Sequence, residues 1–390
     1  MDFAETEELQ LIRQSIREVA SDYDYSYWKD CFDTKTFPQE YWDDLSDAGW
    51  VGAIIPTEYG GGGLGMKEMA VIIEELGRGG DMGASSTVFV LTPVFGGITI
   101  QEHGTDSQKE RYLPAIAAGE MRFCMALTEA SAGTNTLNIK TAAEQNGEQF
   151  VVDGQKMWTS GVENADEMLL IARTSEADDH ERASGLTMFL VPDPANQPGI
   201  DIAPLDVGIP EFETQYQVNI SNLAVPEDRV LGKVDHGLSL LWDTLNTERI
   251  AGAATALGGG LRALDLAVDY AKERVVFDEP IGGHQAIQHP LAESYAKLQS
   301  ARTMTYKAAW EYDTGAAAGA TANIAKLLAS QAATEMADRA IQTHGGNGFA
   351  RDYEVYDIWQ IARLTQTTPV PNEMVKNYLA EHALDLPRSY

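Results

Sequence analysis

The hydrophobic and polar positions change period twice along the chain. Before about residue 120 the apolar residues recur at helical spacing, which predicts helices at 5–21, from Pro38 to Gly49, at 66–79, at about 83–103 and at 106–118. From 121 to 232 they alternate or form short blocks between Gly, Pro, Asn and Asp, which is typical of short strands joined by turns. The helical period returns at about 237–273, 285–314, 318–344 and 372–384.

This order predicts a multidomain α+β protein. A chain of 390 residues exceeds the usual size of a single core. We expect an all-α domain at 1–121, an antiparallel β-barrel or sandwich at 122–232, and a four-helix bundle at 233–390. The glycine-rich segment 56–65 is interpreted as a connecting loop, because no strand-to-helix phosphate-binding frame surrounds it.

The helix at 237–273 carries an acidic residue on an apolar stripe. At about 100° per residue, Glu248 falls on the same side as Leu238, Leu241, Leu245 and Gly252. Burial raises the pKa of a carboxyl group toward the range in which it can accept and hold a proton. Glu248 is therefore a candidate base. From the pattern of this helix alone, the alternative is that Glu248 and Arg249 form an ion pair with a purely structural role.

The charge balance restricts the possible partners. The chain has 59 acidic and 28 basic residues, so its formal net charge is −31. Such a halophile-like surface repels nucleic acid and anionic membranes, so neither is expected as a partner. Any site for an anionic ligand needs local Arg, Lys or backbone N–H donors.

The positions of cysteine and histidine and the lengths of the apolar runs argue against a metal-binding, secreted or membrane-spanning protein. Cys31 and Cys124 form no CxxC motif, and His284 and His289 are poorly spaced for metal binding, so no metal site is expected. The start, MDFAETEELQ, is too acidic for a signal peptide, and no apolar run reaches the roughly 20 residues of a membrane span. We expect a soluble, cytoplasmic protein.

Several strings resemble the acyl-CoA dehydrogenase family over essentially the whole chain. They occur in the same order as in that family: PTEYGGGGLG and EELGRG, MALTEASAGTNTLNIKT at 125–141, VDGQKMWTSG at 152–161, NLAVPEDRVLG at 222–232, ERVVFDEPIGGHQAIQ at 273–288 and QTHGGNGFARDYEVYDIWQIAR at 342–363. The resemblance implies FAD as cofactor, bound between the β domain and the bundle, and an acyl-CoA thioester as substrate. It also implies α-proton removal by a carboxylate, hydride transfer to flavin N5, an electron-transfer flavoprotein as partner and a homotetramer.

The same resemblance assigns site residues. Thr134, Asn246 and Arg249 match residues that contact the substrate, and Thr134 also lies at the cofactor. The positions matched to FAD contacts are Met125, Leu127, Thr128, Gly133, Trp158, Thr159, Ser160, Arg274, Phe277, His284, Gln285, Gln342, Gly345, Gly346 and Glu373. Arg274, Gln342 and the Gly345–Gly346 pair match contacts across a subunit boundary.

The chain departs from the common pattern at the base. Most family members carry a glutamate shortly before the last helix, where this chain has Pro369. A minority, including isovaleryl-type enzymes, carry the base on the first bundle helix directly before the arginine, which corresponds to Glu248 here. Proline also lacks the N–H that helps to hold the thioester oxygen in the majority enzymes, so Val370, a shifted turn or water must supply that donor.

These departures leave three functions open. The first is an FAD-dependent acyl-CoA dehydrogenase with Glu248 as base. The second is a reductase of an enoyl-CoA similar to crotonobetainyl-CoA, in which the same groups work in the opposite direction. The third is a non-catalytic partner subunit of a mixed oligomer, which Pro369 would permit.

Overall fold

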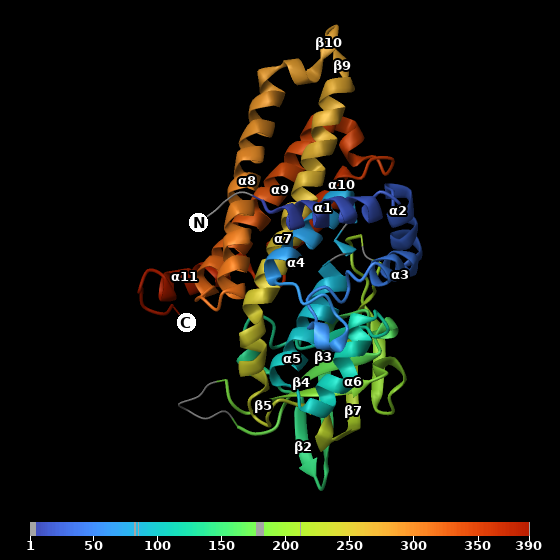
Figure 1. The fold of residues 1–390 in the computed structure, drawn as a ribbon, viewed down its shortest axis with the longest axis vertical. Coiled ribbons are helices and arrows are strands. Elements are labelled where there is room, and N and C mark those ends of the chain that lie inside the picture. Colours follow the sequence, from blue (N-terminus) through green and yellow to red (C-terminus); the bar gives the residue numbers. More distant parts are fainter. Residues whose placement is uncertain (1–4, 82, 85, 177–182, 211, 390) are drawn as a thin grey trace. The chain divides into compact units, whose positions relative to one another are not determined.

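The computed structural model describes residues 5–389 except 82, 85, 177–182 and 211 (Figure 1). The chain forms two compact units. Unit 1 comprises Met1–Asp30, Gly65–Thr87 and Asn246–Tyr390, and unit 2 comprises Cys31–Leu64 and Val88–Leu245. This division differs from the domain boundaries expected at 121 and 232, which stay a prediction.

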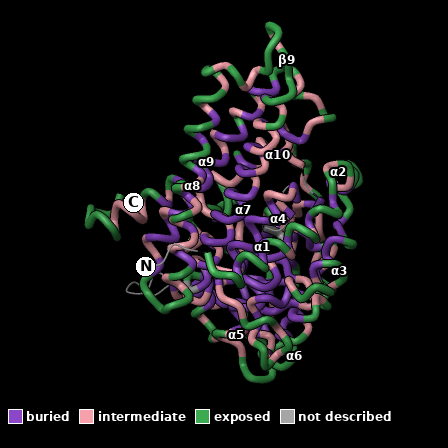
Figure 2. Tube along the Cα trace, turned by 45° about the horizontal axis from the view of Figure 1, so that its top comes forward, coloured by how far each residue is buried: buried purple, intermediate pink, exposed green. Residues whose placement is uncertain are grey.

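Unit 1 is built mainly from helices. They are α1 (Glu7–Ala20), α4 (Met66–Gly79), α8 (Gln285–Asp313), α9 (Gly319–His344), α10 (Val355–Leu364), α11 (Asn372–His382) and most of α7 (Gly237–Glu273). In Figure 1, α8 and α9 run side by side, and a small hairpin of β9 (Val275–Val276) and β10 (Glu279–Pro280) joins α7 to α8. Figure 2 shows that this hairpin is exposed while much of α7 is buried.

Small residues let the helices of unit 1 approach closely. A Cβ on Gly258 of α7 would lie 2.8 Å from the Cα of Gly77 in α4, and one on Gly260 would lie 3.0 Å from the Cα of Ala333 in α9. Buried alanines recur along α9, at positions 325, 329, 332, 333, 337 and 340. A core of this kind depends on backbone proximity more than on large side chains.

Charged residues are buried where α1, α4 and α8 meet. Glu74 of α4 is fully buried and accepts hydrogen bonds from Arg13 Nη1 at 2.9 Å, Arg302 Nε at 3.1 Å and Tyr306 Oη at 2.7 Å. Glu75 is paired with Arg13 and Arg17. Because each buried carboxylate has cationic partners, the cluster is stable only as a complete set.

Unit 2 contains a mixed sheet with the strand order β6-β7-β3-β2-β4-β5-β8, and β1 pairs with β4. The strands are β1 (Phe123–Ala126), β2 (Ala142–Asn146), β3 (Gln149–Ser160), β4 (Glu167–Arg173), β5 (Leu186–Pro192), β6 (Ile200–Pro204), β7 (Gln215–Pro226) and β8 (Val230–Leu231). The other elements of this unit include α3 (Gln39–Asp47), α5 (Thr99–His103) and α6 (Asp106–Ala117). One hydrophobic core cluster of this unit includes Phe150, Leu170, Phe189 and Val218.

The helical, then β, then helical order predicted from the sequence is confirmed. The expected helices at 66–79 and 237–273 coincide with α4 and α7. Most strand pairs are antiparallel as predicted, whereas the β1–β4 and β2–β4 pairs are parallel. The predicted helix at 83–103 includes residue 85, which lies outside the described residues; its remainder is a π-helix at Ser86–Ile98 that continues into α5.

Among the described residues, two α-helices were not predicted. They are α2 (Tyr25–Thr34), which crosses from unit 1 to unit 2, and α10. In α10 the buried residues Val355, Ile358 and Ala362 do have helical spacing, so the pattern was present but short. Among the described residues, no helix combines the length and apolarity that crossing a membrane requires.

Candidate active site

Glu248 lies on α7 in unit 1, and its side chain is partly buried. Burial raises the pKa of Glu248 to about 7, while the positive charges of Arg249 and Lys326 oppose the increase. A carboxyl group with this pKa is present in both protonation states near neutral pH. It can therefore accept a proton from a carbon acid and later release it.

Arg249 follows directly on the helix and carries an unsatisfied donor. Its Nε atom is buried and has no hydrogen-bond partner. Burial lowers the pKa of Arg249, although the charge of Glu248 and the nearby Tyr378 oppose this effect. No ion pair joins Glu248 to Arg249 among the residues that the structure describes, so the structural ion pair considered from the sequence does not form. A buried donor without a partner is suited to an acceptor on a ligand.

A turn between α10 and α11 covers the same face of α7. A Cβ on Gly252, one helical turn after Glu248, would lie 3.2 Å from Cδ of Pro369. The turn is held from α9 by Lys326, whose Nζ donates to the Val370 carbonyl at 2.6 Å and to Asn372 Oδ1 at 2.7 Å. Pro369 is thus fixed beside the helix that carries Glu248.

Lys326 was missed by the sequence reasoning. It is almost fully buried, and burial lowers its pKa to about 8, with partial opposition from the charge of Glu373. The signal that could have found it is a single lysine within the alanine-rich run NIAKLLASQAA, because an apolar helix face seldom holds an unpaired cation. Its partners, Val370 and Asn372, lie too far along the chain to be identified from the sequence.

In unit 2, a buried ion pair shapes the segment after β1. Lys156 Nζ donates to the Leu127 carbonyl at 3.0 Å and to Glu129 Oε1 at 2.9 Å. The Met157 N–H donates to the Thr128 carbonyl at 2.8 Å. Burial lowers the pKa of Lys156 to about 8, with opposition from Glu129. These contacts fix the backbone of residues 127–129 against β3.

The next residue along β3 presents an exposed aromatic ring. Trp158 is 56% exposed, and its φ of 61° lies in the left-handed region that non-glycine residues rarely adopt. Beside it, Thr159 is buried with an Oγ1 that has no hydrogen-bond partner, and Ser160 Oγ donates to Gln215 Oε1 at 3.0 Å. A strained backbone that exposes a large indole is a feature found at ligand-binding sites.

Comparisons with family models identify the class of protein to which these features belong. The sequence matches the acyl-CoA dehydrogenase N-terminal domain at 6–120, the middle domain at 124–222 and the C-terminal domain at 235–384. The chain belongs to the acyl-CoA dehydrogenase family.

Individual relatives agree with this membership. Acyl-CoA dehydrogenase FadE12 of Mycobacterium tuberculosis is 38% identical over 390 residues, which cover 100% of this chain and 99% of that protein. The 3-(aryl)acrylate reductase of Clostridium sporogenes is 31% identical, with coverage of 97% and 99%. Among solved structures, the glutaryl-coenzyme A dehydrogenase glutaryl-CoA complex superposes with a TM-score of 0.93 at 26% identity, covering 100% of this chain and 98% of that one.

Other predicted substrate and cofactor residues of this acyl-CoA dehydrogenase family member lie near the features described above. Asn246 is partly buried in unit 1 near Tyr378, on the helix that carries Glu248. Met125, Leu127 and Thr128 are partly buried in unit 2, and Gly133 and Thr134 are exposed in the following turn. The predicted flavin contacts at 125–160 therefore lie in unit 2, whereas the predicted base lies in unit 1.

A third group of predicted residues lies in exposed parts of unit 1. Phe277 is 89% exposed at the tip of the β9–β10 hairpin with a φ of 54°, and His284 Nδ1 lies 3.4 Å from Glu279 Oε1. The remaining members of this group are also exposed: Arg274, Gln285, Gln342, Gly345, Gly346 and Glu373. The roles of Arg274, Gln342 and the Gly345–Gly346 pair across a subunit boundary stay a prediction.

Proposed function

We propose that this protein is an FAD-dependent acyl-CoA dehydrogenase in which Glu248 is the α-proton base. The observation that carries the proposal is the partly buried Glu248 with a pKa of about 7, on the helix face that Pro369 covers. Membership of the acyl-CoA dehydrogenase family supports an oxidoreductase acting on the CH–CH bond of an acyl-CoA thioester. Proline has no acid group, so in this proposal Glu248 supplies the carboxylate.

In the proposed reaction the Glu248 carboxylate accepts the proton that leaves Cα of the thioester. The hydride on Cβ leaves with its electron pair, a double bond forms between Cα and Cβ, and the product is the enoyl-CoA. FAD, when bound, supplies the acceptor for that hydride. The buried Arg249 Nε lies on the adjacent residue and is free to donate to an oxygen of the substrate.

Lys326 has a positioning role in this mechanism. Its two hydrogen bonds hold Val370 and Asn372, and its positive charge partly offsets the increase in the pKa of Glu248. The turn that contains Pro369 is therefore fixed before substrate arrives. A preorganised turn avoids the cost of rearrangement during the reaction.

The residues of unit 2 suit a flat aromatic cofactor. Trp158 offers an exposed ring beside the buried Thr159 hydroxyl that has no partner. The Lys156–Glu129 pair holds the backbone of Leu127 and Thr128 in place. This set of an aromatic face, hydroxyl groups and a rigid backbone fits the isoalloxazine ring of FAD.

A reductase is the second candidate function. The relative from Clostridium sporogenes is named a 3-(aryl)acrylate reductase, and it matches nearly the whole chain. The same groups serve that direction, because a protonated Glu248 can donate a proton to Cα when a hydride is delivered to Cβ. The electron-transfer flavoprotein, the homotetramer and the cytoplasmic location stay predictions.

The test is flavin reduction in the purified holoenzyme. We expect the wild type to bleach anaerobically with an acyl-CoA, and Glu248→Gln to bind the thioester without bleaching, because its amide cannot accept the proton. Glu293→Gln on the exposed side of α8 is the matched control and is expected to bleach like the wild type. Full reduction by Glu248→Gln would remove Glu248 from the mechanism.

Two further results would change the assignment. Reoxidation of chemically reduced flavin by enoyl-CoA, without bleaching by acyl-CoA, would favour the reductase. A colourless protein that releases no FAD on denaturation would favour the non-catalytic subunit.

A further inference from the structure

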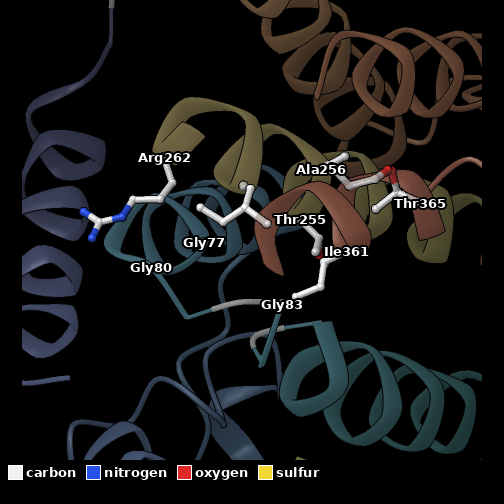
Figure 3. Close-up of a pocket in the computed structure, with 11 residues that line it drawn as sticks. Gly77, Gly80, Gly83, Thr255, Ala256, Arg262, Ile361 and Thr365 are labelled. Carbon is white, nitrogen blue, oxygen red and sulfur yellow. The ribbon is translucent and has the colours of Figure 1, made fainter. Parts of the chain in front are cut away.

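Several arginines of this acidic chain are paired with carboxylates. Figure 3 shows the Arg262 guanidinium of unit 1 extending away from Thr255 and Ile361, which line a small pocket. Its Nη2 atom donates to Glu354. Arg173 of unit 2 differs, because each hydrogen bond of its guanidinium to the described residues goes to a backbone carbonyl. A guanidinium directed to neutral carbonyls, in a chain with 59 acidic residues, indicates a role in fixing the backbone.

The Arg173 guanidinium holds the segment that follows β1. Nε donates to the Ile139 carbonyl at 3.0 Å, Nη2 to the Leu137 carbonyl at 2.8 Å, and Nη1 to the Ser175 carbonyl at 3.3 Å. The two shorter bonds use the planar fork of the guanidinium, which fixes two acceptors at once. Arg173 is the last residue of β4, a buried strand that pairs along its whole length with β5. A rigid strand therefore carries these donors.

The two carbonyls belong to a single 3-10 turn, at Thr136–Asn138, and to the residue after it. The Asn138 N–H donates to the Asn135 carbonyl at 3.1 Å, so the turn includes Asn135. Thr134 directly precedes Asn135 in the chain. The turn therefore connects Thr134 to the carbonyls that Arg173 holds.

Glu129 closes the base of the same segment. Its carboxylate accepts from the backbone N–H groups of residues 140–141 at 2.7 and 2.9 Å. Residues 132–139, which we call the arch, rise from this base, and the backbone of Glu129 pairs with the first residue of the arch at 3.0 and 3.2 Å. Thr134 at the top of the arch is exposed. Glu129 thus holds the base of the arch, and Arg173 holds its returning side.

We propose that Arg173 is a positioning residue for the thioester site and that it acts by holding Thr134 in place. This inference rests on the proposed acyl-CoA dehydrogenase function, in which Thr134 is a predicted substrate contact. Without the two carbonyl contacts, the top of the arch is less ordered before the ligand binds. Binding must then order it, which weakens the affinity. Leu127 precedes the base and is held through Lys156, so FAD contacts there do not depend on Arg173.

The test measures the binding of two unreactive ligands to the FAD-loaded protein. S-butyl-CoA and S-octyl-CoA thioethers lack the carbonyl that acidifies Cα, so calorimetric titration measures affinity without turnover. Thr134→Val removes the hydroxyl at nearly constant shape, and Arg173→Met removes the fork but keeps an unbranched stem. Arg173→Lys keeps the positive charge. Arg111→Met, on the exposed side of α6, is the control for removing one positive charge from a protein that binds an anionic ligand.

We expect Thr134→Val and Arg173→Met each to weaken binding by roughly threefold to tenfold, the size expected for one lost hydrogen bond. The double variant should bind about as tightly as Thr134→Val alone, because Arg173 then has no hydroxyl to position. Arg173→Lys should bind less tightly than the wild type, since one ammonium group does not reproduce the fork. Arg111→Met should stay within about twofold of the wild type, and the FAD content of every variant should stay near that of the wild type.

Four results would each overturn the proposal. Multiplicative effects in the double variant would show that Arg173 does not act through Thr134, and wild-type affinity in Thr134→Val would remove the contact itself. Wild-type affinity in Arg173→Lys would show that only the charge acts on the ligand. Loss of FAD from Arg173→Met would show that Arg173 supports the whole cofactor segment. If Arg173→Met does not fold, Arg173→Lys takes its place in the double variant.

Flavin reduction by acyl-CoA separates this inference from the proposed function. If the two residues are coupled in thioether binding but no acyl-CoA reduces the flavin, the reaction assignment is wrong and the role of Arg173 stands. If acyl-CoA reduces the flavin and the two effects multiply, only the role of Arg173 is wrong. A wild type that binds neither thioether would overturn both.

Discussion

Replacing Glu248 with glutamine should stabilise the folded protein at neutral and alkaline pH. Burial raises the pKa of Glu248 from 4.5 to about 7, so the folded environment disfavours the charged carboxylate even with Arg249 and Lys326 nearby. One pKa unit corresponds to 1.36 kcal/mol, and the difference amounts to about 3 kcal/mol when the group is fully charged. Glutamine has nearly the same shape and no charge to desolvate.

The sign of the pH dependence follows from proton counting. Between about pH 4.5 and pH 7 the folded protein binds more protons at this site than the unfolded chain does. The contribution of Glu248 to the free energy of unfolding therefore falls as pH rises through this window, and it stays low above pH 7. Below pH 4.5 both states are protonated, so the wild type and Glu248→Gln should have similar stability there.

The assay is thermal unfolding of the holoenzyme at about pH 5 and pH 8 in the same buffer ions. Glu248→Gln should have a Tm close to that of the wild type at the lower pH and a clearly higher Tm at the upper pH. Glu293→Gln, an exposed residue on α8, controls for the general effect of removing one negative charge from an acidic protein. A Tm difference that is equal at both pH values, or that matches the control, would refute the burial argument.

Three other outcomes are expected. The rate of flavin reduction by acyl-CoA should rise with pH and level off above about pH 7, because only deprotonated Glu248 accepts the proton; stopped-flow rates that are flat from pH 6 to pH 8 would contradict this. Glu74→Gln should lower the free energy of unfolding by about 3–5 kcal/mol, because it removes the carboxylate partner of Arg302 and one of the carboxylate partners of Arg13. Glu335→Gln, in the more exposed pair with Lys297, should change it by less than about 1 kcal/mol in denaturant titrations. Lys326→Met should lower kcat while FAD content stays near wild type, because Val370 and Asn372 lose the donor that holds their turn; a variant with wild-type kcat would show that the turn needs no such support.

The repeating patterns were sufficient to predict the main elements and the acid. Apolar spacing located α4 and α7, and the change of period separated the β region from the helices. Glu248 was identifiable because a single acid interrupts an apolar stripe on one helix, and the structure shows the expected increase in its pKa. The apolar spacing and the acid on an apolar stripe both depend on residues within a few helical turns, so the sequence shows them directly.

Contacts between distant segments could not be predicted in the same way. The three letters GGG at 258–260 are identical, yet one residue faces α4, one faces α8 and α9, and Gly259 faces open space. Likewise the sequence contains Glu74 and Arg302 but does not show that these residues, 228 positions apart, come together in the fold. Which buried charge finds which partner depends on helix packing, and no local pattern encodes that choice.

Two residues on α7 lower the stability of the fold, and this helps to distinguish a catalytic chain from a non-catalytic one. A charged Glu248 costs about 3 kcal/mol and Gly259 about 1 kcal/mol relative to alanine, against a typical net stability of 5–15 kcal/mol. Substitutions that remove such costs are easy to find and need no rearrangement here, since an alanine at 259 meets no neighbouring atom. A subunit without a catalytic role would gain stability from replacing the charged acid. An enzyme needs the acid at the reacting carbon, so the cost of keeping Glu248 on this helix favours the catalytic interpretation over the non-catalytic one.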